Sequence, residues 1–163
     1  MLPGMGIMGT IGCILLCEAA GLVGAAFTRR SVRTWYPTLR KPWFTPPSWL
    51  FAPAWILLYV LMGISLSLAW SASPSPSEHP LPFAVFAAQL VVNAAWSFLF
   101  FGLRRPSVAL AGIVLLWCLI VATILLFLEL STFAAALLVP YLLWVSFATL
   151  LNASIWKLNR GTH

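Results

Sequence analysis

Long apolar runs fill most of the chain, and short polar or proline-containing segments separate them. Each run is about 20 residues long, which is the length that an α-helix needs to cross the hydrocarbon core of a bilayer. The expected helices cover residues 5–28, 51–70, 83–101, 107–128 and 133–156. We therefore predict an all-α membrane protein, a bundle of five transmembrane helices, with residues 1–163 forming a single domain.

The connections between the runs differ in character. Residues 71–82 form a polar, turn-rich loop that has no apolar run able to enter a bilayer. Residues 102–106 form a short basic turn, and residues 129–132 leave room only for a tight connection. The fourth and fifth helices should therefore be antiparallel neighbours.

Residues 35–59, WYPTLRKPWFTPPSWLFAPAWILLY, are the least helix-like part of the chain. Each proline inside a helix removes an N–H donor and clashes with the preceding turn, so this proline-rich segment is not one regular helix. It also carries tryptophans and cations beside the start of an apolar run. We predict an ordered first loop that covers a pocket at the membrane interface.

Composition places the chain in the membrane. Hydrophobic residues make up 62% and charged residues only 7% of the chain, and the mean hydropathy is +1.00. This is too little polar surface for a soluble protein of 163 residues. The net charge of +6 therefore indicates orientation and contact with anionic lipid, and not a nucleic-acid partner.

The basic residues predict the orientation. Five spans put the first and third connections and the C-terminus on one side, and all nine basic residues fall there: Arg29, Arg30, Arg33, Arg40, Lys41, Arg104, Arg105, Lys157 and Arg160. The positive-inside rule then predicts a cytoplasmic C-terminus. Residues 1–12 contain no Lys or Arg and Glu18 interrupts the first run, so we expect a retained helix there, not a cleaved signal peptide.

Polar side chains within the expected spans are candidates for structure or function. Gln89, Asn93 and Ser97 recur at i, i+4 and i+8, so they lie on one stripe of a helix that faces protein or a cavity. Interhelical hydrogen bonding and direct ligand contact both explain this stripe. Asn152 is expected to supply similar interhelical bonds. Glu18 is expected to be protonated or hydrogen-bonded to another helix, and not catalytic.

Cysteine and histidine usage argues against metal chemistry. Cys13 and Cys17 on the first helix and Cys118 on the fourth fall short of a structural metal site, and we expect them to pack in the core. His79 lies in a loop and His163 is the last residue, so neither is placed to bind haem iron within the bundle. The sequence has no glycine-rich phosphate loop, nucleophile elbow or carboxylate pair. We expect a binding protein that requires no cofactor or metal, rather than an enzyme.

The nine tryptophans remain to be explained. The aromatic belt at membrane interfaces accounts for three of them: Trp43, Trp70 and Trp156. Four others fall inside expected spans, where a lipid-facing indole N–H would lack a partner: Trp55, Trp96, Trp117 and Trp144. These positions predict a flat apolar ligand packed between aromatic rings.

Several motifs in order carry a family resemblance. They are WYxxLxKP at residues 35–42, PPxWxxxPxW at residues 46–55, LLYVLMG at residues 57–63, QLxxNxxWSxxFF at residues 89–101 and PYxxWxxFAxxLN at residues 140–152. Together they resemble the translocator protein (TspO/MBR) family, also called tryptophan-rich sensory proteins or peripheral-type benzodiazepine receptors. The resemblance extends over nearly the whole chain.

The resemblance implies a five-helix bundle, commonly a homodimer, whose first loop closes over a pocket for porphyrins such as protoporphyrin IX and for other flat apolar ligands. It implies that the following residues line this pocket: Ala26, Trp35, Trp49, Ala52, Trp55, Asn93, Ala111, Leu115, Trp144, Ala148 and Leu151. The small residues in this set would leave room for a flat ring system.

The sequence departs from animal members of the family at two places. Their cholesterol motif contains a tyrosine near the end of the fifth helix, where this chain has Ala153 and Ser154, so cholesterol is not an expected partner. The first loop has Phe44 and Thr45 where many relatives have tryptophan and histidine. The chain is similar to bacterial members, and we expect it in a bacterial cell membrane, or in the mitochondrial outer membrane if it is eukaryotic.

Three function classes follow. The first is a tetrapyrrole-binding sensor or transporter in porphyrin or stress regulation. The second is a light- and oxygen-dependent breakdown of porphyrin that uses Trp55 and Trp144. The third is a structural membrane dimer, for which Ala84 and Ala88 form a small-xxx-small pair. Basic residues of the first loop, Arg40 and Lys41, are either topology anchors or partners of porphyrin carboxylates.

Overall fold

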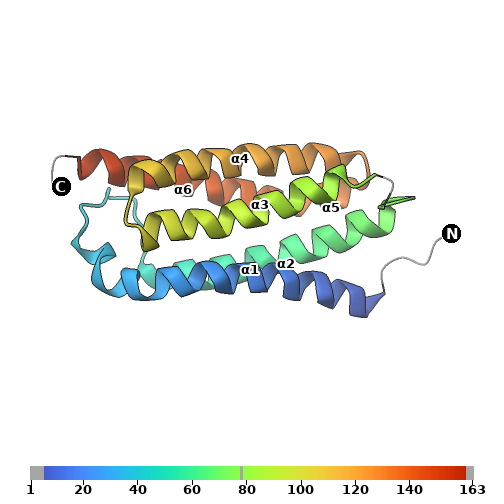
Figure 1. The fold of residues 1–163 in the computed structure, drawn as a ribbon, viewed down its shortest axis with the longest axis horizontal. Coiled ribbons are helices and arrows are strands. Elements are labelled where there is room, and N and C mark those ends of the chain that lie inside the picture. The colour runs from blue at the N-terminus through green and yellow to red at the C-terminus, as the bar shows by residue number, and fades with distance from the viewer. Residues whose placement is uncertain (1–5, 78, 161–163) are drawn as a thin grey trace.

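Five helical segments long and apolar enough to cross a membrane make up a computed structural model of the chain, which describes residues 6–77 and 79–160 (Figure 1). The segments are α1 (Ile7–Thr34), α2 (Ser48–Ala72), α3 (Leu81–Ser97) continued by the π-helix η2 (Phe98–Gly102), α4 (Pro106–Leu128), and α5 (Thr132–Ala136) followed by α6 (Val139–Leu158). A short 3₁₀ helix, η1 (Tyr36–Thr38), lies between α1 and α2. The prediction of an all-α, multi-pass membrane protein is confirmed.

The helix boundaries differ from the sequence prediction at the first connection. Helix α1 continues to Thr34, beyond the predicted end at residue 28, and so includes three arginines. Arginine is a good helix former, and its long side chain can extend from a helix end toward the interface. Helix α2 begins directly after Pro47, so that Pro53 lies inside the helix.

The helices form a ring in which α1 packs against α2 and α3, α3 against α4, and α4 against α6 (Figure 1). The short helix α5 contacts both α4 and α2. Helices α2 and α6 touch each other at few positions. These two helices are therefore only loosely packed against each other.

Two glycines bring α1 and α2 together. A Cβ atom added to Gly63 would meet the backbone of Ile14, and one added to Gly21 would meet the ring of Tyr59. Small residues permit this kind of close helix approach in a membrane, where packing drives association. These two contacts fix the position of α1 against α2.

Hydrogen bonds between spans add to this packing. The hydroxyls of Thr10 and Ser67 lie 2.7 Å apart, and the hydroxyl of Ser65 donates to the carbonyl oxygen of Ala134 at 2.7 Å. The side-chain amide of Asn152 donates to the carbonyl oxygen of Pro106 at 2.7 Å. The prediction that Asn152 supplies an interhelical bond is confirmed.

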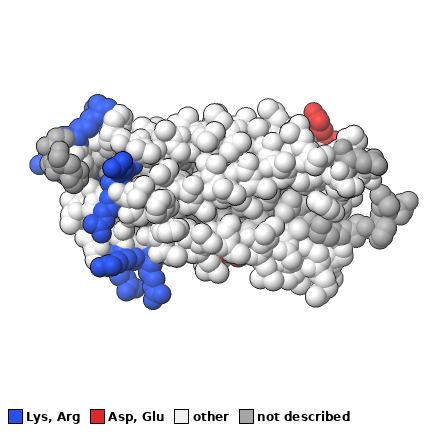
Figure 2. All heavy atoms as spheres, in the orientation of Figure 1, with Lys and Arg blue, Asp and Glu red and all other residues white. Residues whose placement is uncertain are grey.

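Lysines and arginines gather at the end of the bundle where α6 ends, and an acidic side chain lies at the opposite end (Figure 2). The described cations come from the end of α1, the first loop, the turn before α4 and the end of α6. This is the grouping that the sequence predicted. Between the two ends, large apolar side chains such as Leu15, Val91 and Leu143 are exposed, as expected of a lipid-facing surface. Ala84 and Ala88 are also exposed, on α3.

Candidate functional site

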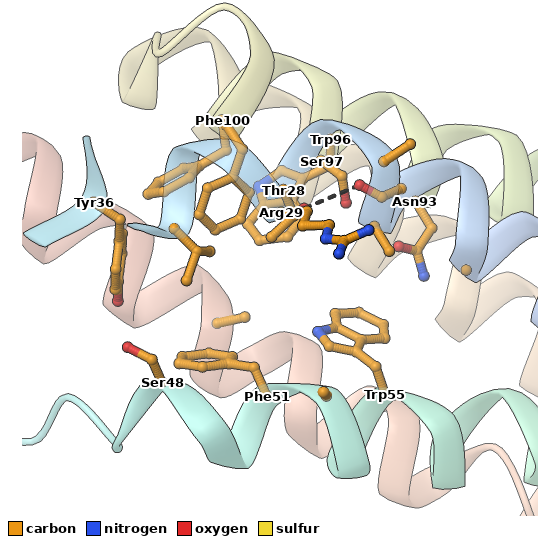
Figure 3. Close-up of a pocket in the computed structure, with 18 of the residues that line it drawn as sticks. Thr28, Arg29, Tyr36, Ser48, Phe51, Trp55, Asn93, Trp96, Ser97 and Phe100 are labelled. Atoms are coloured by element: carbon orange, nitrogen blue, oxygen red, sulfur yellow. Dashed lines mark hydrogen bonds between the residues drawn. The ribbon is translucent and has the colours of Figure 1, made fainter. Parts of the chain in front are cut away.

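A cavity of about 670 Å³ lies within the bundle (Figure 3). Its lining comes from α1, Tyr36, α2, α3, η2 and α6, and no described residue of α4 contributes to it. The lining is predominantly apolar. This volume lies within the usual range for pockets that bind small molecules and cofactors.

Aromatic rings form much of the cavity wall. Figure 3 shows Phe51 and Trp55 pointing from α2 toward Trp96 and Phe100 on the other side of the space. Trp144 of α6 also lines the cavity and meets Phe51 edge to face, with ring centroids 6.0 Å apart. Rings on opposite sides of a cavity favour a flat apolar ligand between them.

Small residues on three helices create the room. Gly21 and Ala26 on α1, Ala52 on α2 and Ala148 on α6 all line the cavity. A larger side chain at Ala26, Ala52 or Ala148 would extend into space that a ligand needs, whereas a Cβ atom at Gly21 would meet the ring of Tyr59. Gly24 on α1 allows the hydroxyl of Ser97 to approach this helix, because a Cβ atom added to Gly24 would lie 3.0 Å from Ser97 Oγ.

A buried hydrogen-bond chain connects α3 with α6. The side-chain amide of Asn93 donates to the hydroxyl of Tyr141 at 2.8 Å, and that hydroxyl donates to Gln89 Oε1 at 2.9 Å. Asn93 also lines the cavity, as does Ser97. Within the polar stripe, Gln89 makes an interhelical hydrogen bond, Ser97 lines the cavity, and Asn93 does both.

Trp96 is held by a second polar contact. Its indole N–H donates to Asn152 Oδ1 at 3.1 Å, and both residues line the cavity. Because Asn152 is itself bonded to the carbonyl oxygen of Pro106, the indole ring is fixed relative to α4 and α6. Hydrogen bonds to two other helices thus hold this part of the cavity wall in position.

Four residues of the cavity lining lie near the basic end of the bundle, and we call them the mouth: Arg29, Arg33, Tyr36 and Ser48. The hydroxyl of Tyr36 is buried and has no hydrogen-bond partner among the described residues. Burial raises the pKa of Tyr36 to about 12, so the hydroxyl stays protonated at neutral pH. Figure 3 shows the side chains of Tyr36 and Ser48 pointing toward each other.

Glu18 lines the cavity from the middle of α1 and is half-buried. Within residues 6–77 and 79–160 it forms no hydrogen bond or ion pair. Of the two expectations for Glu18, the hydrogen bond to another helix is therefore not formed, and a protonated carboxyl stays a prediction. Glu18 lies on the same face of α1 as Arg29, because 11 residues are close to three full turns, or about 16 Å along the helix axis. The carboxyl group and the mouth are therefore at different depths of the cavity.

Most of the residues that the resemblance implied surround this cavity: Ala26, Ala52, Trp55, Asn93, Trp144, Ala148 and Leu151. Four do not line it. Trp35 packs against Phe100 at 5.8 Å between ring centroids, and Trp49 is 71% exposed.

Ala111 and Leu115 are exposed on the outer face of α4. Helix α4 packs between α3 and α6 through residues such as Ile113 and Leu116, and so turns the face of Ala111 and Leu115 away from the bundle. Trp117 is also outside the cavity, and its indole N–H donates to Ser146 Oγ at 2.9 Å.

Sequence reasoning missed the contribution of α1. Besides Ala26, this helix brings Glu18, Leu22, Arg29 and Arg33 to the cavity. Their spacing of four, seven and four residues is a helical repeat that marks one face. The signal was present, but the arginines were interpreted only as charges at the end of a span.

Comparison with known proteins finds a matching family and several similar proteins. The model of the TspO/MBR family matches residues 13–157. The chain is 45% identical to tryptophan-rich protein TspO of Chlorobaculum tepidum over 147 residues, which are 90% of this chain and 93% of that protein. It is 44% identical to tryptophan-rich protein TspO of Archaeoglobus fulgidus (95% and 99% covered) and 35% identical to the translocator protein of Homo sapiens (98% and 91% covered).

Proposed function

The chain belongs to the TspO/MBR family, and on this premise we propose that it binds a tetrapyrrole of the protoporphyrin IX type and acts as a sensor or transporter in porphyrin or stress regulation. One observation carries the proposal: a cavity of about 670 Å³, mostly apolar and walled by Trp55 and Trp144, lies within the membrane-spanning bundle. A flat, largely apolar ring system matches these walls.

The lining favours a porphyrin without a metal. Among the described residues it contains no histidine or cysteine, the side chains that most often bind haem iron. A metal-free porphyrin needs no axial ligand. The aromatic walls would hold it by stacking and edge contacts, and Asn93 and Ser97 offer polar contacts at the ring edge.

The proposal includes a location and an assembly. We place the chain in a bacterial cell membrane with its basic end on the cytoplasmic side, as the positive-inside rule predicts. The basic mouth of the cavity would then face the cytoplasm. The exposed Ala84 and Ala88 of α3 are candidate contacts for a second copy in a homodimer.

Titration of the purified protein with protoporphyrin IX, followed by tryptophan fluorescence, tests the function. Wild type should show saturable quenching, because several tryptophans lie at the cavity. Ala148→Phe, which adds a ring inside the cavity, should weaken binding at least about tenfold by steric exclusion. Ala111→Phe is the matched control on the outer face of α4 and should bind as wild type does. Equal affinities for the two variants would contradict the proposed site.

The placement of Trp55 and Trp144 keeps a second function open, the light- and oxygen-dependent breakdown of the bound porphyrin. Both indoles line the cavity, where they would contact the pigment. Illumination of the complex in air should then bleach the porphyrin absorbance faster than illumination of free pigment. A Trp55→Phe, Trp144→Phe double variant that bleaches the pigment at the wild-type rate would exclude these residues as the agents.

A further inference from the structure

A second cavity lies at the end of the bundle opposite the basic end. Its volume is about 730 Å³, and it is formed where α2 and α4 end and α3 begins. The lining combines prolines, leucines and one alanine with three polar residues: Ser73, His79 and Glu129. It shares no residue with the aromatic cavity described above, so the two are separate sites.

One polar group in this lining lacks a hydrogen-bond partner. Ser73 is 5% exposed, and its hydroxyl makes no hydrogen bond within residues 6–77 and 79–160. A buried hydroxyl without a partner is costly, so such a group in a cavity wall indicates that a ligand atom completes it. The serine side chain turns about a single bond, which lets its hydroxyl meet that atom.

Glu129 gives this cavity a carboxylate that has no basic side chain nearby. No lysine or arginine lines the cavity, and all nine of them lie toward the opposite end of the bundle. The imidazole of His79 adds a ring N–H, which donates a hydrogen bond in either protonation state. The cavity therefore offers a carboxylate to a cation and two neutral hydrogen-bond donors to an anion, and it disfavours a ligand that carries negative charge alone.

The surroundings favour a lipid headgroup over a metal ion. The part of the chain that the structure describes contains no group of three or more His, Cys, Asp or Glu that could hold a metal ion. Leu81, in the first turn of α3, is 60% exposed, and Leu126 lies in the last turn of α4. These turns end membrane-spanning helices, and the ends of such helices lie at the depth of the lipid headgroups. Apolar side chains at this depth can contact the part of a lipid next to its headgroup.

We propose that the second cavity binds a phospholipid whose headgroup carries a primary ammonium beside its phosphate. Glu129 pairs with the ammonium, and the hydroxyl of Ser73 and the imidazole of His79 donate hydrogen bonds to the phosphate oxygens. Leu81 and Leu126 contact the glycerol and the first methylene groups of the acyl chains. With the basic end in the cytoplasm, this lipid belongs to the outer leaflet. The inference does not depend on the porphyrin proposal.

Native mass spectrometry of the protein in detergent, with phosphatidylethanolamine, phosphatidylcholine or phosphatidylglycerol of identical acyl chains, tests this. Phosphatidylethanolamine should bind about tenfold more tightly than the other two, the value of one charge-assisted hydrogen bond. Phosphatidylcholine has no ammonium N–H to donate, and phosphatidylglycerol has no cation. Equal affinity for the three lipids in wild type would overturn the proposal.

Two variants locate the site. Glu129→Gln keeps the shape of the side chain and should lower phosphatidylethanolamine binding to the level of phosphatidylcholine. Ser73→Ala should weaken phosphatidylethanolamine binding, whereas Ser71→Ala, which removes a hydroxyl from the same helix outside the cavity, should leave it unchanged. Circular dichroism checks that each variant is folded. A Glu129→Gln variant that keeps the full preference would show that the lipid binds elsewhere.

Free phosphoethanolamine separates a lipid from a soluble ligand with the same headgroup. It lacks the apolar part that contacts the leucines, so it should not displace the lipid at equal concentration. Displacement at equal concentration would contradict the lipid assignment.

Discussion

The contact between Gly63 and α1 predicts that Gly63→Ala destabilises the bundle. The added Cβ atom would lie 2.7 Å from the backbone nitrogen of Ile14 and closer still to its Cα, whereas ordinary contacts between carbon atoms are about 3.5–4.0 Å. The obstacle is backbone, so no change of rotamer relieves it and α1 must move outward. Overpacking of this kind costs about 1–3 kcal/mol, and the better helix propensity of alanine recovers about 1 kcal/mol.

We expect a net loss of up to about 2 kcal/mol, or a fall in melting temperature of up to about 8 °C for a chain of this size. Thermal unfolding in detergent, followed by circular dichroism, measures it. Gly12→Ala is the control on α1, because a Cβ atom there would have nothing within 4 Å. It should match or exceed wild-type stability. Gly63→Ala with a melting temperature equal to that of Gly12→Ala would refute the close packing of α1 on α2.

Three further predictions concern the polar contacts and the first loop. Tyr141→Phe removes the hydroxyl between Gln89 and Asn93 and should lower stability by about 1–2 kcal/mol, measured by thermal unfolding; an unchanged melting temperature would contradict this hydrogen-bond chain. Because burial raises the pKa of Tyr36 to about 12, the folded protein holds this proton more tightly than the unfolded chain, whose tyrosine has a pKa near 10. The stability from Tyr36 should therefore be complete below about pH 10 and be lost as the pH rises toward 12, and Tyr36→Phe should lack this part of the alkaline loss in a pH series of unfolding curves. Cleavage of the first loop at an engineered protease site near Thr45 should weaken porphyrin binding while leaving the melting temperature unchanged, and unaltered binding would show that the loop does not cover the cavity.

The number and order of the helices could be predicted because an apolar run of membrane length has few alternatives. A helix that crosses a bilayer must be long and must satisfy its own backbone, and the chain is long enough for five such runs. The positions of the basic residues also predicted which helix ends lie at the same end of the bundle. The C-terminal end of α1 was harder to predict, since arginines are compatible both with a helix and with the loop after it.

Cavity residues could be predicted from the sequence only where a residue of a family motif also lies on an inward face of its helix. Trp55 and Trp144 lie on inward faces of α2 and α6, and both line the cavity. Ala111 and Leu115 do not, because the rotation of α4 is set by its packing against two neighbours, which an apolar run without a polar face does not reveal. The hydroxyl of Tyr36 also required the fold, since its lack of a partner depends on what surrounds it.

A structure of the protein in complex with protoporphyrin IX would show whether the cavity within the bundle is the binding site. We expect the porphyrin ring to lie against Trp55 and Trp144. A porphyrin bound instead on the outer face of α4, beside Ala111 and Leu115, would contradict it.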